Sequence, residues 1–465
     1  MLPATNVLFD ADRMRRYDRE GPRYTSYPTA RQFADWVAPN AYEWAAASSR
    51  GAREGLPLSA YVHIPFCFTP CFFCACNKVV THRLHRIDTY VRHLLAEISR
   101  RSRYFDKNRV IDQMHFGGGT PTFLPKKLLI DIIEGLDREF RLTDAPDRDY
   151  SIEIDPRSAD EGIFRLLSAL GFNRISLGVQ DFDDRVQRAV NRVQPEATVA
   201  RVYEAARKLG FPSVNFDLIY GLPFQTPSSF SSTLDRVIAM RPDRLAVYGY
   251  AHMPSMFKAQ RQIRDEDLPD AAGRLALLQI AVGKLGEAGY QYIGMDHFAL
   301  PGEPLARAKQ NGTLHRSFQG YTTHANRDLV AFGVSAIGQV DNLYVQNHKS
   351  LRDYGTAVAS GTLPSNRGKS MTRDDCIRKD VIDAIMCHGL VDIPALETRH
   401  GVVFNEYFAA ERRRLDAMQS DGLVELDERH IALTPVGQLL MRNVAMVFDA
   451  YLDAPSQPVP MSRVI

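Results

Sequence analysis

The sequence predicts an α/β protein built around a partial parallel (β/α) barrel of about six strand–helix units. Two observations lead to this prediction. From about residue 58 onward, short runs rich in β-branched and aromatic residues alternate with amphipathic helices, and glycine or polar residues follow most of these runs directly. Repeated strand–helix units form parallel sheets with right-handed crossovers, and ligands bind at the carboxyl ends of their strands. We therefore expect the functional residues just after the strands.

The expected strands and helices follow one another in a regular order. The strands cover residues 59–63, 111–116, 150–154, 174–179, 214–220, 245–250 and 290–294. Helices lie between them, and two apolar stripes are made by Ile87, Tyr90, Val91, Leu94, Leu95 and Ile98 and by Leu128, Leu129, Ile132, Ile133 and Leu136. This order is the one that a parallel sheet with helical crossovers requires.

Composition divides the chain into three expected regions. Residues 1–55 hold few periodic elements, and the prolines and aromatics of Gly21–Thr29 favour an ordered, extended arm, which we expect to pack over the barrel mouth. Residues 56–365 form the barrel and its extension. Residues 366–465 form a mainly helical, winged-helix-like C-terminal domain.

The last elements of the chain give the C-terminal domain its expected character. Helical segments at 380–387 and 407–418 precede two short strands, 422–426 and 430–433, and a helix that begins at Pro435. Helices that end in such a hairpin are typical of a winged-helix unit. Because the charge of the chain is balanced, we expect this domain to act as a lid or packing element and not to bind DNA.

Composition also excludes several classes of protein. With 465 residues, 45% of them apolar and 24% charged, the chain can form about three compact units and bury a sizeable core. Its 57 basic and 55 acidic side chains leave a formal charge of +2, so no overall field draws it onto nucleic acid or an anionic membrane. No stretch approaches the roughly 20 apolar residues of a spanning helix, and residues 1–6 do not look like an export signal. We expect a cytoplasmic protein that binds neither nucleic acid nor membrane.

The cysteines indicate a metal centre. Of the six, two stand alone near the far end of the chain and four lie within ten residues, namely Cys67, Cys71, Cys74 and Cys76. A disulfide framework would spread the cysteines in pairs, so a cluster in a reducing compartment favours metal. Three thiolates spaced by three and then two residues, on a loop that contains Pro65 and Pro70, can hold three corners of an iron–sulfur cube and leave the fourth iron open.

Structural zinc and buried thiols without a ligand are the alternatives that the cysteine spacing leaves open. Zinc closes a tetrahedron with four ligands, usually from two separated pairs, and no second pair lies nearby. Cys76 would have to be the fourth ligand, although it lies only two residues from Cys74. The aromatic residues around the loop fit core packing and also a shell that keeps water from a cluster: Phe66, Phe68, Phe72 and Phe73.

Glycines and polar residues stand where the next strands end. The strand at 111–116 runs into Gly117–Pro121, where missing side chains let backbone amides approach a ligand, although a plain tight turn explains the same residues. The run lacks the lysine of a phosphate-binding loop, which disfavours nucleoside triphosphates. Later strands end at Glu153 and Gln180, and the next strand contains Asp217. Each alone is more typical of a strand-end hydrogen bond, but together they suit the amine, hydroxyls and carboxylate of a polar cofactor.

These motifs resemble the radical S-adenosylmethionine superfamily, in which a Cys-x3-Cys-x2-Cys loop follows the first strand and a glycine run follows the second. Within it, the chain resembles the oxygen-independent coproporphyrinogen III oxidases (dehydrogenases) over nearly its whole length. The motifs that carry this narrower resemblance are Gly21–Thr29, His63–Cys67, Cys74–Lys78, Met295–Phe298, Phe318–Thr323 and Ser462–Ile465. One departure is Ala75, where the family usually has glycine. A methyl group there costs little unless the turn needs a positive φ.

The resemblance implies a set of cofactor contacts. Cys67, Cys71 and Cys74 would hold a [4Fe-4S] cluster whose fourth iron is open to S-adenosylmethionine, with Cys76 nearby as a non-ligand. A first S-adenosylmethionine would contact Tyr61, Gly118, Glu153 and Ile337. A second one, or the substrate in that space, would contact Phe73, Gly119, Thr120, Gln180, Arg192, Asp217 and Ala251. These roles are carried over from the family.

The activity that the resemblance implies is the anaerobic oxidative decarboxylation of coproporphyrinogen III to protoporphyrinogen IX, a step of porphyrin and haem biosynthesis. Two propionates become vinyl groups, each after a 5′-deoxyadenosyl radical removes hydrogen from an unactivated carbon, so we expect no catalytic side chain. A low-potential electron donor of the flavodoxin or ferredoxin type and a monomeric chain are further expectations. The alternative is a haem-binding or haem-delivery protein without decarboxylase activity, although such relatives typically lack Cys76 and the arm at 24–29.

Cationic groups are expected around the barrel mouth, because this substrate carries several carboxylates. Arg23 in the arm and Arg192 after the fourth strand are the candidates, and a surface or structural salt bridge is the alternative role for each. His63 and His297 are left outside the catalytic set, because a lone histidine is more often a hydrogen-bonded structural residue.

Overall fold

The computed structural model describes residues 7–35, 38, 40–452 and 461–463. Residues 1–6, on which the expectation about an export signal rests, and residues 464–465 of the last motif lie outside these ranges. The chain divides into two compact units. The cysteine unit comprises Gln32–Asp217 and Asn326–Met371, and the terminal unit comprises Met1–Arg31, Leu218–Ala325 and Thr372–Ile465. The three-part division into 1–55, 56–365 and 366–465 stays a prediction.

A parallel sheet forms the centre of the cysteine unit. Its strands stand in the order β13-β1-β4-β5-β6-β7, and the pairs from β13 to β6 are parallel. The bounds are β1 Leu58–Ile64, β4 Ile111–Gly118, β5 Asp149–Ile154, β6 Arg174–Gln180, β7 Ser213–Tyr220 and β13 Asp328–Phe332. The register places Ile64 opposite Gly118 and Ile154 opposite Leu177, so the carboxyl ends lie along one edge. The expected α/β class and the strands expected between residues 59 and 220 are confirmed.

Three antiparallel strands extend this sheet beyond β13, and the sequence does not predict them. They are β14 Ile337–Val340, β15 Leu343–Asn347 and β16 Ser365–Ser370, paired in that order. β13 and β15 are buried at every residue. They therefore lack the alternation of apolar and polar residues that marks a half-buried strand, and the sequence predicts only an unspecified extension here.

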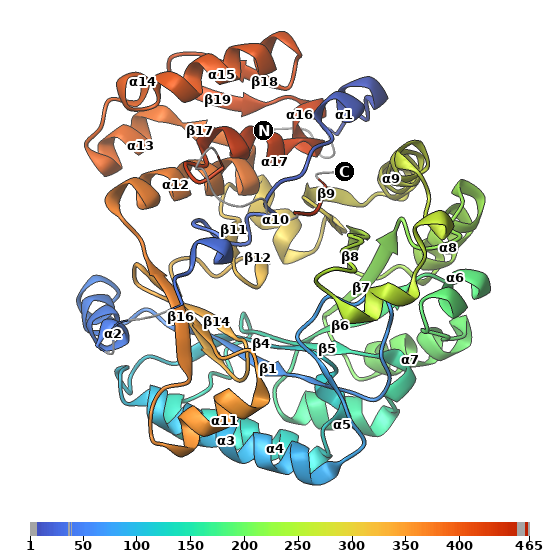
Figure 1. The fold of residues 1–465 in the computed structure, drawn as a ribbon, viewed down its shortest axis with the longest axis vertical. Coiled ribbons are helices and arrows are strands. Elements are labelled where there is room, and N and C mark those ends of the chain that lie inside the picture. The colour runs from blue at the N-terminus through green and yellow to red at the C-terminus, as the bar shows by residue number, and fades with distance from the viewer. Residues whose placement is uncertain (1–6, 36–37, 39, 453–460, 464–465) are drawn as a thin grey trace. The chain divides into compact units, whose positions relative to one another are not determined.

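Helices pack on this sheet because one face of each is apolar. Figure 1 shows α3 (Leu84–Ser102), α4 (Lys126–Phe140) and α11 (Leu351–Ala359) next to one another on one side of β1 and β4. The expected stripes of α3 and α4 are largely buried, for example at Ile87 and Leu136. The other elements of this unit are α2 Ala41–Ala52, α5 Glu161–Ala169, α6 Asp184–Ala189, α7 Glu196–Lys208, β2 Phe66–Cys67, β3 Val79–Val80 and 3-10 turns at Pro121–Phe123 and Pro156–Ser158.

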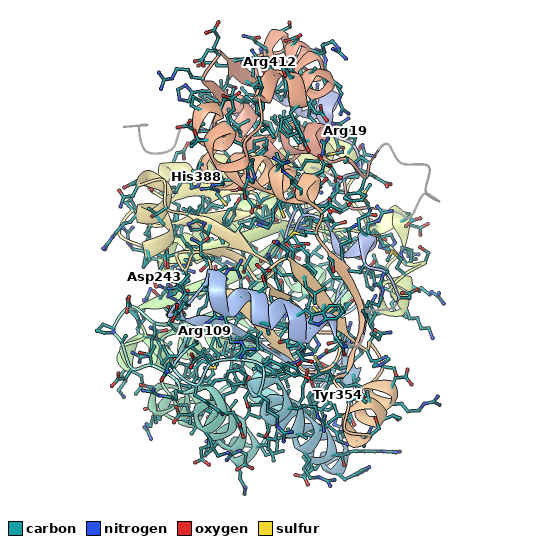
Figure 2. The ribbon with its side chains drawn as sticks, turned by 90° about the vertical axis from the view of Figure 1, so that its left-hand side faces the viewer. Arg19, Arg109, Asp243, Tyr354, His388 and Arg412 are labelled. Atoms are coloured by element: carbon teal, nitrogen blue, oxygen red, sulfur yellow. The ribbon has the colours of Figure 1, made fainter. Side chains whose placement is uncertain are left out.

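A buried polar network holds the antiparallel edge of the sheet against α3. The Glu97 carboxylate accepts hydrogen bonds from Arg101 at 2.8 Å, from the Tyr354 hydroxyl at 2.7 Å and from the Asn347 amide at 2.8 Å. Glu97 and Arg101 are fully buried, so the loss of one partner would leave a charge without compensation. Figure 2 labels Tyr354 and the equally buried Arg109, which both belong to this unit.

The strands at 290–299 of the terminal unit are antiparallel. β8 (Arg244–Gly249) pairs with β10 (His297–Ala299), which pairs with β9 (Gln291–Gly294). The expected strand at 290–294 is present as β9. The prediction that it belongs to a further parallel strand–helix unit was wrong. Only two residues separate β9 from β10, and a parallel crossover needs about a dozen or more. The other elements here are α8 Pro227–Met240, α9 Ala271–Glu287, α10 Pro304–Gln310, β11 His315–Ser317, β12 Gly320–Thr322 and 3-10 turns at Lys258–Gln262 and Asp265–Asp267.

Helices dominate the C-terminal part of the terminal unit, as expected. α12 (Arg373–His388) begins after Thr372, whose side chain forms a capping box with Asp375, and ends at Gly389 in the left-handed conformation. The two expected strands are present, and a third, β17, pairs with β19; its three residues are too few for a sequence signal. The bounds are α13 Ile393–His400, α14 Phe404–Tyr407, α15 Ala409–Ser420, α16 Pro435–Leu439, α17 Met441–Ala445, β17 Leu390–Asp392, β18 Val424–Leu426, β19 His430–Leu433 and a 3-10 turn at Met446–Phe448.

The first 55 residues contain more helix than the sequence predicts. In the chain, α1 (Ala11–Tyr17) precedes and α2 follows the run Gly21–Thr29. This run is described in full and has neither helix nor strand. Tyr24 is buried, and its hydroxyl donates to Asp449 Oδ2 at 2.9 Å within the terminal unit. The run is therefore ordered, as expected, but it bends at residues 25–28 and Tyr24 has a φ of +45°, so it is not extended throughout. None of the described helices has the length and apolarity needed to cross a membrane.

Candidate active site

The loop that carries the cysteines, between β1 and α3, is pinned at its ends and in its middle. β2 and β3 pair across its ends. In the middle, the Phe72 N–H donates to the Val190 carbonyl oxygen at 3.0 Å. The His63 Nε2 atom lies 2.9 Å from the Asn77 carbonyl oxygen, so His63 is a hydrogen-bonded structural residue, as expected. These bonds fix the loop without using a thiol.

All four clustered cysteines line one cavity of about 640 Å³ in the cysteine unit. The other walls come from residues at or just after the ends of β4, β5 and β6 and from β7. The cysteines are free thiols. Among the described residues, no three His, Cys, Asp or Glu side chains come close enough together to hold a single metal ion. The clustered thiols instead border a shared space.

The glycine run after β4 lets the strand end pack tightly against the cysteine loop. Gly118 has a φ of +112°, and a Cβ at Gly119 would lie 2.6 Å from the Phe66 carbonyl oxygen. The Gly118 N–H donates to Glu153 Oε2 at 3.1 Å, and the Gly119 N–H donates to the Ile64 carbonyl oxygen at 2.8 Å. These glycines therefore serve the cavity by leaving space, while their amides bond within the protein.

Glu153 brings a negative charge to the cavity. Burial disfavours that charge, but hydrogen bonds from His115 and from the Gly118 N–H outweigh it and hold the pKa of the Glu153 carboxyl below its ordinary value. The His115 Nε2 atom lies 3.4 Å from Glu153 Oε1, and the Ser151 hydroxyl lies 2.7 Å from His115 Nδ1 and orients the ring. The ionised carboxylate suits an ammonium group of a ligand.

Asp217 brings a second carboxyl group to the same cavity, in a different state. The Ser176 hydroxyl donates to its Oδ2 at 2.7 Å and the Asn215 amide to its Oδ1 at 2.8 Å. Despite these bonds, burial and the nearby Glu153 charge raise the pKa of Asp217 to about 6. Of these two carboxyl groups, Glu153 is ionised at neutral pH and Asp217 exchanges its proton close to it.

Two arginines contact the thiol of Cys71. Arg192 Nη1 lies 3.4 Å and Arg157 Nη2 lies 3.7 Å from the Sγ atom. Both also bond Asp155 Oδ2, at 3.2 Å and 2.6 Å, and Arg192 donates to the Gly178 carbonyl oxygen at 2.6 Å. The Arg192 Nε atom is buried without a hydrogen-bond partner among the described residues. This geometry directs Arg192 toward the cysteine loop and favours a role beside the thiols.

The donor set fits an iron–sulfur cluster held by thiolates. A hydrogen bond from Cys76 and the charge of Lys78 lower the pKa of the Cys74 thiol, whereas burial raises the pKa of Cys67 to about 11. Thiols must lose their protons to bind metal, and metal binding itself drives that loss. The Cys71 thiol already faces two guanidinium groups, which would offset the negative charge of a thiolate-bound cluster.

The residues expected to contact S-adenosylmethionine mostly meet at this cavity. Those that line it are Phe73, Gly118, Gly119, Thr120, Glu153, Gln180, Arg192 and Asp217. Tyr61 lies on β1, where its ring stacks on His115 at 5.9 Å between centroids and its hydroxyl lies 3.1 Å from His63 Nδ1. Ile337 is buried on β14, and Ala251 belongs to the terminal unit, where it lines a second cavity. The structure does not place these last three in the lining.

Other residues of the lining are missing from the sequence-based set. Arg157 stands three residues after β5, so the rule that functional residues follow strand ends would have found it. Lys78 lies inside one of the family motifs, and Ser176 lies within β6, where no local signal marks its contact with Asp217. Contacts across neighbouring strands require the register, which the sequence alone does not give.

The alanine that departs from the family pattern is accommodated. Ala75 is absent from the described non-glycine residues that have a positive φ. The turn between Cys74 and Cys76 therefore does not need glycine, and the methyl group adds no backbone strain, as expected.

Comparisons with known proteins agree with the motifs. The family model described as the Radical SAM superfamily matches residues 61–237, and the HemN C-terminal domain matches residues 371–440. The oxygen-independent coproporphyrinogen III oxidase of Pseudomonas aeruginosa is 49% identical over 96% of this chain and 97% of its own length. That of Escherichia coli is 45% identical over 100% of both chains. The solved structure of coproporphyrinogen III oxidase (HemN) from Escherichia coli, described as a radical SAM enzyme, has a TM-score of 0.91 and 44% identity, covering 96% of this chain and 100% of its own.

Proposed function

The chain belongs to the family of oxygen-independent coproporphyrinogen III oxidases, and on that premise we propose that it converts coproporphyrinogen III to protoporphyrinogen IX in porphyrin biosynthesis. Two propionate side chains become vinyl groups without molecular oxygen: each loses one hydrogen atom to a radical, carbon dioxide, and one electron to an acceptor outside the chain. The observation that carries this proposal is the cavity at which the spaced cysteines meet Glu153, Asp217 and the strand ends. As a radical SAM enzyme, the protein uses an iron–sulfur cluster and S-adenosylmethionine.

Three thiols hold the cluster in this proposal. When bound, a reduced [4Fe-4S] cluster with S-adenosylmethionine supplies a carbon-centred radical that removes hydrogen from an unactivated carbon, which no side chain does at neutral pH. Cys67, Cys71 and Cys74 bind three irons, and Cys76 lines the cavity as a non-ligand. Arg157 and Arg192 lie against Cys71 and offset the charge of the thiolates.

Glu153 binds the ammonium group of the first S-adenosylmethionine. Its carboxylate is ionised and faces the cavity, which supports a charge-assisted hydrogen bond to a ligand cation. Gly118 lines the same wall, where the missing side chain leaves room for the ligand. Tyr61 and Ile337 complete this set from the family alone.

A second S-adenosylmethionine, or the substrate in that space, occupies the part of the cavity near Asp217. The residues of this set that line the cavity are Phe73, Gly119, Thr120, Gln180, Arg192 and Asp217. Phe73 offers an apolar ring to a base, and Asp217 offers acceptor oxygens to hydroxyl groups. Ala251, in the terminal unit, is assigned from the family alone. A second molecule of the cofactor is thus a proposal from the lining and the resemblance together.

The side chains bind, orient and exclude water, and none acts as a general base for the abstraction. Phe68, Phe73 and Phe123 give the cavity an apolar wall, which disfavours water near a reactive intermediate. The fixed loop and strand ends hold the ligands in one geometry, which brings the target carbon close without further loss of freedom. Placement is therefore what this chain contributes to the rate.

The partners are proposed from the same chemistry. The cluster is reduced from outside the chain, by a low-potential donor of the flavodoxin or ferredoxin type. We propose a monomer in the cytoplasm. We also propose that it binds neither nucleic acid nor membrane, which the formal charge of +2 supports. The haem-delivery alternative has no support among the similar proteins named above, which carry the name oxidase.

An anaerobic product assay tests the proposed function. The reconstituted protein is incubated with coproporphyrinogen III, S-adenosylmethionine and a strong reductant, and the products are separated by chromatography. The expected result is protoporphyrinogen IX together with carbon dioxide. Unchanged substrate combined with tight haem binding would favour the haem-delivery alternative, and a methylated product would indicate a different radical enzyme.

A further inference from the structure

The outer side of the cysteine loop carries large apolar side chains that are exposed. Phe68, Val80 and Leu84 are 57%, 41% and 66% exposed, and all three belong to the cysteine unit. The Phe68 ring meets the edge of the His82 ring at 4.4 Å between centroids, and Leu84, the first residue of α3, follows two residues after His82. A single exposed apolar residue is ordinary, but three on adjoining segments indicate a surface that another molecule covers.

This apolar surface lies directly outside a thiol that is proposed to bind the cluster. Cys67 pairs with Val80 across β2 and β3, and the Thr81 N–H donates to the Cys67 carbonyl oxygen at 3.2 Å. Phe68, the neighbour of Cys67 in the chain, is exposed and also lines the cavity. Electron transfer between proteins weakens steeply with distance, so an electron donor has to dock close to the cluster. The outer side of the loop meets this requirement.

Basic groups stand beside the apolar surface. Residues 82–86 are exposed at every position, and Arg83 and Arg86 are among them. Within the described part of the chain, neither guanidinium group has a hydrogen bond or an ion pair. Residues 66–87 include no Asp or Glu. The two arginines therefore keep their charge available to a partner.

The surroundings do not cancel this positive charge. Asp88 is the next acidic residue along the chain, and it interacts with Lys127 on α4: a hydrogen bond to Asp131 and, to a smaller extent, the charge of Asp88 raise the pKa of Lys127. The first turn of α3 holds no acidic residue, so the positive end of the helix dipole adds to the charge of the arginines. This surface is therefore locally positive, although the formal charge of the whole chain is +2.

We propose that Phe68, Val80, Arg83, Leu84 and Arg86 form the docking surface for a flavodoxin-type electron donor. The inference rests on the proposed function, which requires a donor outside the chain. Such a donor exposes the apolar edge of its flavin among acidic side chains, which matches apolar residues with basic neighbours. One electron passes from the reduced flavin, which is oxidised, to the cluster, which is reduced, and no bond forms or breaks. Encounters between redox proteins are small and transient, so a surface of a few residues suffices.

A second copy of this chain fits the surface less well than an acidic donor. In a two-fold dimer the same surface of each copy faces the other, so the arginines of the two copies would meet. Like charges placed opposite one another cost free energy. An acidic partner has the opposite effect, because the positive surface draws it in from solution.

The test measures electron transfer into the anaerobically reconstituted holoenzyme by stopped-flow absorbance, with a photochemically reduced flavodoxin as the probe. Arg86→Glu is expected to lower the bimolecular rate of cluster reduction about 5-fold at low ionic strength, and the double variant Arg83→Glu/Arg86→Glu more than about 10-fold. Leu84→Ser should lower it about 3-fold, because less apolar area is buried in the complex. The wild-type rate should fall as salt is added, whereas the rate of the double variant should not.

Two controls separate docking from damage to the cluster and from net charge. Reduction by methyl viologen, a small molecule that needs no docking surface, should differ less than about 2-fold among all these proteins. Arg103→Glu makes the same change of charge at the exposed other end of α3, roughly 25 Å along the helix from Arg86, and should keep the wild-type rate with flavodoxin. Arg86→Glu should unfold at no lower temperature than the wild type, since an acidic residue favours the first turn of a helix.

The proposal is wrong if the flavodoxin does not reduce the wild type, if the double variant is reduced at the wild-type rate, or if methyl viologen shows the same loss. A dimer that dissociates in the double variant, with unchanged electron transfer, would instead assign the surface to a second copy of the chain. A wild type that accepts electrons through Arg83 and Arg86, yet makes no protoporphyrinogen, would contradict the proposed function and still support the docking surface.

Discussion

The two cavities differ in how the chain builds them. The cavity in the cysteine unit is bordered by one short loop and the ends of successive strands, and an arginine of its wall, Arg192, bonds Asp155 in the same wall. The cavity in the terminal unit joins residues 441 positions apart, such as Glu20 and Met461, and its arginines outnumber its carboxylates. A cofactor site that rests on a local motif is visible in the sequence. A cavity assembled from distant segments is visible only after folding.

Replacement of any one of Cys67, Cys71 or Cys74 by serine should have the largest effect on the function of the cysteine cavity. Each variant should lose the brown absorbance of the reconstituted cluster and lower product formation by more than about 100-fold, since loss of an outer-shell partner alone costs up to about that much. Iron and sulfide content, visible absorbance and product chromatography measure the effect. The control is Cys76→Ser, which should keep the cluster. Loss of the cluster in that control would contradict the ligand assignment.

Gly119→Ala tests whether the tight contact between the β4 end and the cysteine loop matters. The added Cβ would lie 2.6 Å from the Phe66 carbonyl oxygen, so the loop has to move. We expect a loss of roughly 1–3 kcal/mol in the free energy of unfolding, together with poorer iron loading. Thermal unfolding and iron per chain are the measurements.

A matched glycine shows whether that effect is local. Gly51 lies in α2 of the same unit, and a Cβ there would meet no atom within 4 Å. Gly51→Ala should leave iron loading unchanged and stabilise the protein by up to about 1 kcal/mol, because alanine favours helix. Equal destabilisation by both substitutions would show that the contact with Phe66 is not the cause.

The effect of Asp217→Asn on stability depends on pH. The folded-state pKa of about 6 lies above the ordinary 3.8, so ionisation of Asp217 opposes folding. The free-energy cost of ionising Asp217 in the folded protein is absent below pH 3.8 and grows between pH 3.8 and 6. Above pH 6 it reaches about 1–3 kcal/mol. The asparagine variant should therefore gain stability over the wild type at pH 7.5 relative to pH 4. Urea unfolding at the two pH values measures this, and a gain that does not vary with pH would refute the assignment.

The parallel core could be predicted because its signals are local. The runs that became β1, β4, β5, β6 and β7 each hold a short β-rich segment followed by a turn and an amphipathic helix. The cysteine spacing and the polar residues in or just after these strands are equally local, so the sequence predicts Glu153 and Asp217 at a site. The structure brings them to one cavity because parallel strands end at the same edge.

The remaining features depend on contacts that no local pattern encodes. The fully buried β13 and β15 show no alternation, and β9 turns into β10 too quickly for a parallel crossover. Arg274 stands in the first turn of α9, where nothing in the neighbouring residues marks its contact with a cavity. Arg442 joins that cavity only because the arm and the chain end meet on it.

Electron paramagnetic resonance of the anaerobically reconstituted and reduced protein tests the central assignment most directly. Three thiolate ligands leave one iron without a side chain, so addition of S-adenosylmethionine should change the cluster spectrum, in the wild type and in Cys76→Ser alike. A spectrum that does not respond to S-adenosylmethionine, or a protein that holds zinc in place of iron and sulfide, would contradict the account.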